Sequence, residues 1–176
     1  MTARIVLQPA DITRALTRIS HEILESNREW LDTVILGIPT RGVILAQRIG
    51  ATMQGAADLS VAVGSLDVTM YRDDLARNPT RTPGRTEVPA GGIDGKLVVL
   101  VDDVLYSGRT IRAALDALSA IGRPRYVRLA TLVDRGHREL PIRPDFIGKN
   151  LPTAEGERIN VRLAEIDGVE EVTIES

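Results

Sequence analysis

Two kinds of hydrophobic pattern alternate along this chain. From residue 11 to 27, apolar side chains recur every three or four positions, which is typical of a helix with one buried face and Asp11 as its N-cap. The same period predicts helices at 43–54 and 110–121. A continuous apolar run at 97–101 predicts a central parallel strand covered on both faces, and shorter strand patterns are found at 33–36, 59–63, 66–70 and 127–133. The alternation indicates an α/β fold with a mostly parallel central sheet flanked by helices.

Residues 73–95 interrupt this pattern. They hold three prolines and several glycines and little that is apolar. A loop of this length inside a domain is usually a functional lid or a disordered segment, and the strand pattern resumes directly after it. Beyond residue 134 only short strand patterns remain, around Ile147, 159–163 and 169–174. We therefore predict one domain over residues 1–176 rather than two domains joined by a linker.

Composition narrows the chemistry. The chain has 176 residues and no cysteine, which excludes disulfides, cysteine-ligated zinc and thiol catalysis, and its two histidines are too few for a typical zinc site. A net charge of −2 and an aromatic content of 3% argue against a generally basic nucleic-acid binder and against stacking platforms. Because no signal peptide or membrane span is recognisable, we expect a cytoplasmic protein with no membrane partner.

The segment from Val98 to Thr110 carries the clearest chemistry. An apolar strand ends in Asp102 and Asp103, and a loop with Ser107 and Gly108 then opens a helix. Ligands of open α/β sheets bind at the carboxyl ends of strands, and a helix N-terminus attracts anions. Carboxylates suit sugar hydroxyls, so the segment predicts a site in which the acids hold a ribose and the loop holds its 5′-phosphate. The alternative is an acid pair that only caps a turn, with Ser107 or Thr110 as a helix cap.

This segment resembles the PRPP-binding signature of type I phosphoribosyltransferases. The resemblance extends along nearly the whole chain to one family, PyrR, the bifunctional pyrimidine-operon regulators and uracil phosphoribosyltransferases. The matching segments are a first helix at 15–22, a pyrophosphate loop at 37–42, the start of a flexible loop at 67–75, and a base-binding hood at 133–145 and 147–153. The hood segments, RGHRELPIR and GKNLPT, are the most specific, because many transferases share the PRPP signature.

The resemblance implies the type I phosphoribosyltransferase fold. It also implies a small hood, formed by about 134–176 with the N-terminal segment, and a flexible lid at about 71–95. The implied reaction converts uracil and PRPP into UMP and pyrophosphate, with Mg²⁺ carried by PRPP and no direct metal ligand from the protein. The implied catalytic residues are Asp102, Asp103, Arg41 and Arg72.

The substrate-binding residues implied by the resemblance fall into three groups. The first would bind pyrophosphate, the second ribose and its phosphate, and the third uracil. They are Thr40, Arg41, Gly42 and Arg85; Asp102, Asp103, Val104, Leu105, Tyr106, Ser107, Gly108, Arg109 and Thr110; and Arg135 and Val161. This enzyme class also commonly has a non-prolyl cis peptide, expected here near Thr40–Arg41.

The family further implies a regulator that binds the pyr mRNA leader when UMP is present. Its expected RNA-binding residues are Thr17, Arg18, His21, Arg138, Arg143 and Lys149, and its expected assembly is a homodimer or higher homo-oligomer. The basic side of the first predicted helix is consistent with such a surface, although a solvated helix face would look the same.

Two other functions compete with the bifunctional one. One is an RNA-binding regulator that uses the PRPP/UMP pocket only to sense nucleotide; the intact acid pair, Arg41 and Arg72 argue against it. The other is a phosphoacceptor receiver domain, in which an acid pair should follow the first strand. Here the pair follows several elements.

Overall fold

The computed structural model describes residues 2–29, 31–57, 60–77 and 82–176. Its helices are α1 (Pro9–Ser26), α2 (Arg41–Ala56), α3 (Arg109–Ile121) and the short α4 (Ala164–Asp167), with a 3-10 turn η1 (Thr69–Tyr71). Its strands are β1 (Ala3–Leu7), β2 (Thr33–Gly37), β3 (Val61–Ser65), β4 (Leu97–Leu105), β5 (Tyr126–Asp134), β6 (Phe146–Asn150), β7 (Arg158–Arg162) and β8 (Glu171–Glu175). They form two separate sheets.

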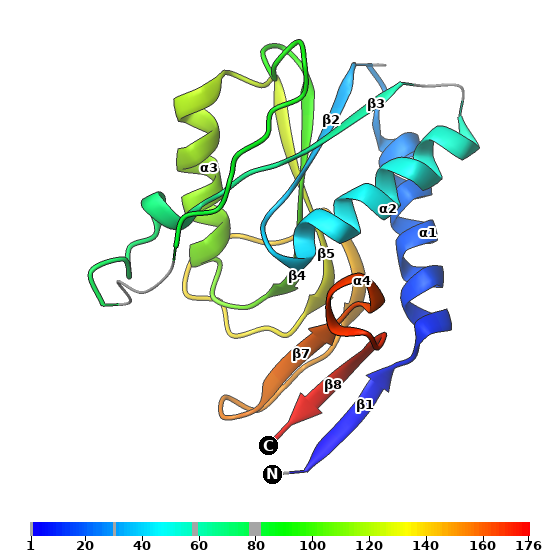
Figure 1. Cartoon of the computed structure of the whole chain (residues 1–176), viewed down its shortest axis with the longest axis vertical. Coiled ribbons are helices and arrows are strands. Elements are labelled where there is room, and N and C mark those ends of the chain that lie inside the picture. The colour runs from blue at the N-terminus through cyan, green and yellow to red at the C-terminus, as the bar shows by residue number, and fades with distance from the viewer. Residues whose placement is uncertain (1, 30, 58–59, 78–81) are drawn as a thin grey trace.

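The larger sheet has five parallel strands in the order β3-β2-β4-β5-β6. Its middle strand, β4, is fully buried from Leu97 to Val101. Helices α1 and α2 pack on one face and α3 on the other, so each face has its own apolar core (Figure 1). The predicted parallel sheet flanked by helices is confirmed.

Helix α1 starts earlier than the sequence predicted. Pro9 occupies its first turn, where a missing N–H costs nothing, and Gln8 is the N-cap. The prediction that Asp11 is the N-cap was wrong: its carboxylate lies in the first turn and accepts the backbone N–H of Gln8 at 2.9 Å. The predicted apolar stripe is otherwise buried, with Ile12, Leu16, Ile19 and Ile23 inside the core.

The smaller sheet joins the two ends of the described chain. Strand β8 lies in its middle and pairs antiparallel with β1 and β7. The sheet sits beyond the carboxyl end of β4, which β7 contacts, and the two chain ends lie side by side (Figure 1). Hydrophobic patterning did not predict β1, because of its five residues only Leu7 is buried.

The predicted strand at 66–70 was wrong. Residues 66–68 are irregular and η1 follows, because the partner strand β2 ends at Gly37, opposite Ser65. On the other edge of β3, Ser65 and Glu87 exchange backbone hydrogen bonds of 3.0 and 2.9 Å. The strand predicted at 59–63 is β3, two residues further along; Leu59 lies outside the described residues. Strand β4 runs past the predicted end to Leu105, because β5 continues to pair with it.

Two glycines let the start of α2 press against the ends of two strands. A Cβ on Gly42 would lie 2.5 Å from the carbonyl oxygen of Val101 on β4, and one on Gly37 would lie 2.4 Å from the carbonyl oxygen of Gly42. Both distances are shorter than any real side chain allows. The contact brings residues 40 and 41 beside the acid pair that follows Val101.

A methyl group at Gly42 should therefore destabilise the protein. We expect Gly42→Ala to lower the free energy of unfolding by about 1–3 kcal/mol, as overpacking does in a close-packed core. Gly55→Ala is the control, because Gly55 lies in the same helix and a methyl group added to it would have nothing within 4 Å. That change should be neutral or add about 0.5–1 kcal/mol. Urea unfolding of both variants tests this, and equal effects would contradict the backbone-contact argument.

Candidate functional site

The acid pair stands at the carboxyl end of the central strand. Asp102 is only 8% exposed, and its Oδ1 accepts the backbone N–H of Asp103 at 3.0 Å. Asp103 is partly buried and accepts the N–H of Val104 at 2.8 Å. Burial, reinforced by the neighbouring charge of Asp103, raises the pKa of Asp102 well above its usual range. Burial also raises the pKa of Asp103, against the opposing effects of the Val104 N–H and of Arg41.

The loop after the acids turns the chain into α3. Gly108 has φ 95°, a left-handed conformation that favours glycine, and it precedes the first residue of the helix. The carbonyl oxygen of Ser107 accepts the backbone N–H groups of Glu139 and Leu140 at 3.0 and 3.2 Å. The loop therefore continues directly into α3 at one end and is hydrogen-bonded to the segment after β5.

A polar cavity of about 420 Å³ lies against this strand end. Its walls come from the acid pair, from the turn before α2, from η1 and its flanks, and from the lid. The lining residues are Ile38, Pro39, Thr40, Arg41, Asp67, Val68, Thr69, Arg72, Thr82, Gly84, Asp102, Asp103, Val104 and Thr110. Six of the substrate residues implied by the sequence resemblance therefore meet here with Arg72: Thr40, Arg41, Asp102, Asp103, Val104 and Thr110.

A second cavity, of about 370 Å³, adjoins the first. The two share Arg41 and Asp103, and the second is also lined by residues 159–162 of β7 and by Glu175. Strand β7 is an edge strand of the small sheet, so one side of its backbone has no strand partner in the part of the chain that the structure describes. Free N–H and C=O groups on such an edge are available to a ligand. The implied substrate residue Val161 lies in this wall.

Both cleft arginines are held by carboxylates. Arg41 donates from Nε and Nη2 to the two carboxylate oxygens of Asp167, at 3.2 and 2.7 Å. Arg72 donates in the same forked manner to Asp74, at 2.9 and 3.1 Å, and also to Oγ1 of Thr110 at 3.0 Å. The peptide bond between Pro39 and Thr40 is cis, one bond before the expected position. Nothing in the sequence pointed to Asp167, because the partner of Arg41 is brought in from the far end of the chain.

The loop after the acid pair, residues 106–108, also contacts the segment after β5 through side chains. The guanidinium of Arg135, 7% exposed, lies 4.1 Å from the centre of the Tyr106 ring, a cation–π contact. Its Nε donates to Oγ1 of Thr153 at 3.0 Å, and the ring of His137 meets the edge of Tyr106. The structure thus unites two implied substrate residues, Tyr106 and Arg135, that stand well apart in the sequence.

Comparison with known proteins agrees with this geometry. Residues 5–164 match the family model described as a phosphoribosyl transferase domain. A protein of Leifsonia xyli subsp. xyli named bifunctional protein PyrR is 70% identical, over 99% of this chain and 98% of its own. One of the same name from Streptomyces coelicolor is 62% identical, over 98% of this chain and 89% of its own. The chain belongs to the PyrR family of phosphoribosyltransferases.

The expected type I phosphoribosyltransferase fold is likewise confirmed. A crystal structure of a hypoxanthine-guanine phosphoribosyltransferase from Bacillus anthracis superposes with a TM-score of 0.72, covering 98% of each chain. At 17% sequence identity this likeness concerns the fold alone. Among the described residues, no helix is long and apolar enough to cross a membrane, and no three His, Cys, Asp or Glu side chains gather as a metal site.

Two arginines expected to bind substrate in this PyrR chain point elsewhere. The side chain of Arg85 is 86% exposed and pairs with Glu87 at 3.5 Å, so the structure does not bring it into the cleft. Arg109 donates to Asp73 of the lid at 2.6 Å and to Glu139 at 2.7 Å. Its side chain therefore joins Asp73 to the segment after β5, while its backbone begins α3.

The expected RNA-binding residues of the PyrR chain divide into two groups. Thr17 and His21 on α1 are exposed, as are Arg143 and Lys149. Arg18 and Arg138 also bind the protein itself. Arg18 donates to the carbonyl oxygens of Ile147 and Gly148 on β6, and Arg138 to the Asp134 carboxylate and the carbonyls of Tyr106 and Ile142. Because α1 packs beside β6, Arg18 and Lys149 lie on neighbouring elements.

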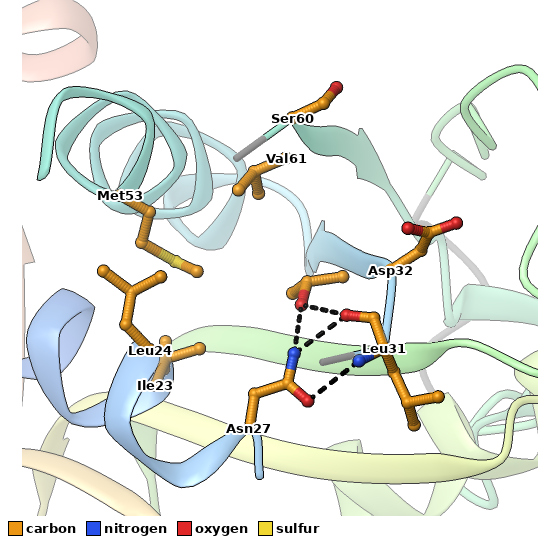
Figure 2. A pocket seen from close by; sticks show the side chains of 9 residues that line it. Ile23, Leu24, Asn27, Leu31, Asp32, Met53, Ser60 and Val61 are labelled. Atoms are coloured by element: carbon orange, nitrogen blue, oxygen red, sulfur yellow. Dashed lines mark hydrogen bonds between the residues drawn. The ribbon is translucent and has the colours of Figure 1, made fainter. Parts of the chain in front are cut away.

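A further cavity lies at the amino end of β2 and measures only about 100 Å³. The amide of Asn27 points to Leu31 and Thr33, and it donates to the Leu31 carbonyl at 2.8 Å while accepting its N–H at 3.2 Å (Figure 2). The polar groups of Asn27 are thus used in hydrogen bonds that stabilise the turn after α1. The cleft at the carboxyl end of β4 is the better candidate site.

The raised pKa of Asp102 yields a stability test. Since the folded state disfavours its charge and the unfolded chain does not, ionisation destabilises the fold, increasingly as pH rises from the usual carboxyl range toward the raised pKa. Asp102→Asn keeps an oxygen for the Asp103 N–H. We therefore expect it to raise the free energy of unfolding at pH 8 by about 1 kcal/mol.

This gain should shrink as the pH is lowered to 5. Urea unfolding at the two pH values is the measurement. Asp116→Asn, on the exposed face of α3, should change stability by less than about 0.5 kcal/mol at either pH. A variant Asp102→Asn that is less stable than the wild type at both values would show that the buried charge is compensated.

Proposed function

We propose that this chain transfers the phosphoribosyl group of PRPP to uracil, forming UMP and pyrophosphate, and that it regulates pyrimidine genes by UMP-dependent binding to the pyr mRNA leader. The observation that carries the enzymatic part is the pair of adjoining cavities that share Arg41 and Asp103. With the ribose held at Asp102 and Asp103, the pyrophosphate of PRPP would lie in the first cavity and uracil would lie in the second. Family membership supports the same function.

The ribose end of PRPP suits the acid pair and the phosphate loop. Ionised Asp102 and Asp103 accept hydrogen bonds from vicinal hydroxyls, which neutral acids do less well. The 5′-phosphate suits the loop from Tyr106 to Thr110, where backbone N–H groups at the start of α3 and the hydroxyls of Ser107 and Thr110 supply donors. The left-handed Gly108 lets the backbone turn closely around that group.

The pyrophosphate end suits the turn before α2 and the lid. Thr40, Arg41 and Gly42 would bind the departing group, and Arg72 would approach from the other wall of the cleft. Mg²⁺ carried by the PRPP phosphates fits this polar cleft, because the ion keeps several of its own waters and needs no cage of protein ligands. Bound there, the ion would neutralise charge on the leaving group. Little covalent chemistry is required of the protein, so positioning and electrostatic stabilisation would dominate.

The uracil end suits the wall formed by β7. A small planar pyrimidine carries N–H and C=O groups that match a free strand edge, and Val161 lies on that edge. Arg135, fixed over Tyr106, would support the neighbouring loop. The lid is joined to the start of α3 by two contacts, Arg72 with Thr110 and Asp73 with Arg109. When the lid closes, it would exclude water from C1 of the ribose, which gains oxocarbenium character as pyrophosphate leaves.

The transferase activity has a direct test. Purified protein mixed with uracil, PRPP and Mg²⁺ should form UMP, and the double variant Asp102→Asn/Asp103→Asn should lose about a hundredfold or more of that rate, because the ribose loses both charged acceptors. Asp116→Asn is the control and should keep full activity. UMP from the wild type alone establishes the reaction and its site. Folded wild type that makes no product with several bases would favour a regulator that only senses nucleotide.

The RNA-binding part rests on the exposed surface around α1 and β6. Thr17, His21 and Lys149 are solvent-accessible on two adjacent elements, as a phosphate-contacting surface requires. The net charge of the whole chain is −2, so any RNA surface must be local, and a homodimer would bring two such surfaces together.

Lysine substitution tests this surface. Lys149→Gln should weaken UMP-dependent retardation of the cognate leader RNA in a gel and reduce the slope of log affinity against log salt by about 1, the loss of one phosphate contact. Lys96→Gln, at the opposite end of the sheet, removes the chain's other lysine and should change neither quantity. Equal effects of the two variants would indicate non-specific attraction, and no retardation by the wild type would contradict RNA binding altogether.

A further inference from the structure

An ionic contact connects the turn between β7 and β8 with α2. Arg41 and Arg48 are two helical turns apart and so share one face of α2. Both meet acids of the β7–β8 turn: Arg41 pairs with Asp167, and Arg48 pairs with Glu165 and Glu170. Through these pairs the small sheet is fastened to the helix that begins at the expected pyrophosphate loop.

Asp167 is itself rigidly held. Its Oδ2 accepts the backbone N–H of Leu163 at 2.8 Å, and its own N–H donates to the Leu163 carbonyl at 2.7 Å. Its side chain is only 18% exposed. The guanidinium of Arg41 and the Leu163 N–H together lower the pKa of Asp167, so the carboxylate is charged across the neutral range.

The pairing leaves part of Arg41 available. Its Nε and Nη2 are used by Asp167, and Nη1 has no hydrogen-bond partner among the described residues. Arg41 lines both cavities, at their junction beside Asp103. An arginine side chain has many rotamers, and fixing it before the ligand arrives removes an entropic cost from binding.

We propose that Asp167 is a positioning residue that acts through Arg41. It holds the guanidinium at the junction of the two cavities, ready for the pyrophosphate of PRPP, and so makes the β7–β8 turn part of the PRPP site. This inference rests on the proposed function for the identity of its ligand. The contrary possibility is an ion pair that blocks Arg41 until PRPP displaces Asp167. The two are distinguished by Asp167→Asn, which weakens PRPP binding if Asp167 positions Arg41 and tightens it if Asp167 blocks Arg41.

The test compares Asp167→Asn with Glu165→Gln, which removes the Arg48–Glu165 ion pair on the same turn and leaves Arg41 unchanged. Calorimetric titration with PRPP and Mg²⁺, together with the KM for PRPP, should show about tenfold weaker binding for Asp167→Asn, the size of one lost charge-assisted interaction. Glu165→Gln should bind PRPP as the wild type does. Asp167→Glu, which restores the charge, should recover part of the loss.

A second comparison asks whether the effect passes through Arg41. In an Arg41→Gln background, adding Asp167→Asn should weaken PRPP binding no further, because the residue that it positions is gone. Additive effects would overturn the proposal, as would unchanged or tighter binding in Asp167→Asn alone. Should that variant not fold, Asp167→Glu carries the same expectation against the wild type, with a smaller loss.

These measurements separate the inference from the function on which it rests. A wild type that binds PRPP but makes no UMP would contradict the proposed reaction, while the binding comparison still decides the role of Asp167. A wild type that makes UMP with an Asp167→Asn variant indistinguishable from it would leave the reaction standing and overturn the positioning role.

Discussion

The site depends on two adjacent carboxylates placed at the buried end of the central strand. The parallel register of β4 with β2 and β5 carries Asp102 and Asp103 into a region shielded from water, and burial raises the pKa of both. No cation contacts them directly among the described residues: the nearest arginines, Arg41 and Arg72, give their hydrogen bonds to Asp167, Asp74 and Thr110. The acids are therefore poorly compensated, and hydroxyl donors or a cation brought by a ligand would relieve that cost.

The arginines around the acids act as ties between segments that are remote in the sequence. Arg41 joins α2 to the β7–β8 turn, Arg72 joins the lid to α3, and Arg109 joins the lid to the segment after β5. Each is partly exposed, so each pair contributes little to global stability. Their importance is geometric, because they set where the positive charges stand before a phosphate arrives.

Sequence reasoning found the parts of the fold that local pattern determines. The apolar run at 97–101 and the helix after Gly108 could be predicted because a buried strand and an amphipathic helix each leave a period in the chain. Strand β1 could not, since it pairs with β8 from the other end of the chain and buries little of its own surface. The same reason hid Asp167: an exposed-looking acid after Leu163 gives no signal until topology brings it to Arg41. Arg85 shows the converse, a residue implied by resemblance that the structure leaves facing Glu87.

The segment after β5, residues 135–145, connects the proposed enzymatic site with the proposed RNA-binding surface. Backbone N–H groups of Glu139 and Leu140 hold the Ser107 carbonyl, and Arg138 holds that of Tyr106, so the phosphate loop and the residues around Arg138 share one hydrogen-bond network. A ligand that orders the loop would also order this segment, because the donors and acceptors are the same groups. By linkage, an RNA surface built on the ordered segment would then bind more tightly with UMP present, and RNA would tighten UMP by the same factor. The proposed dependence of RNA binding on UMP would thus need no large movement of the domain, only a loop and a neighbouring segment that become ordered together.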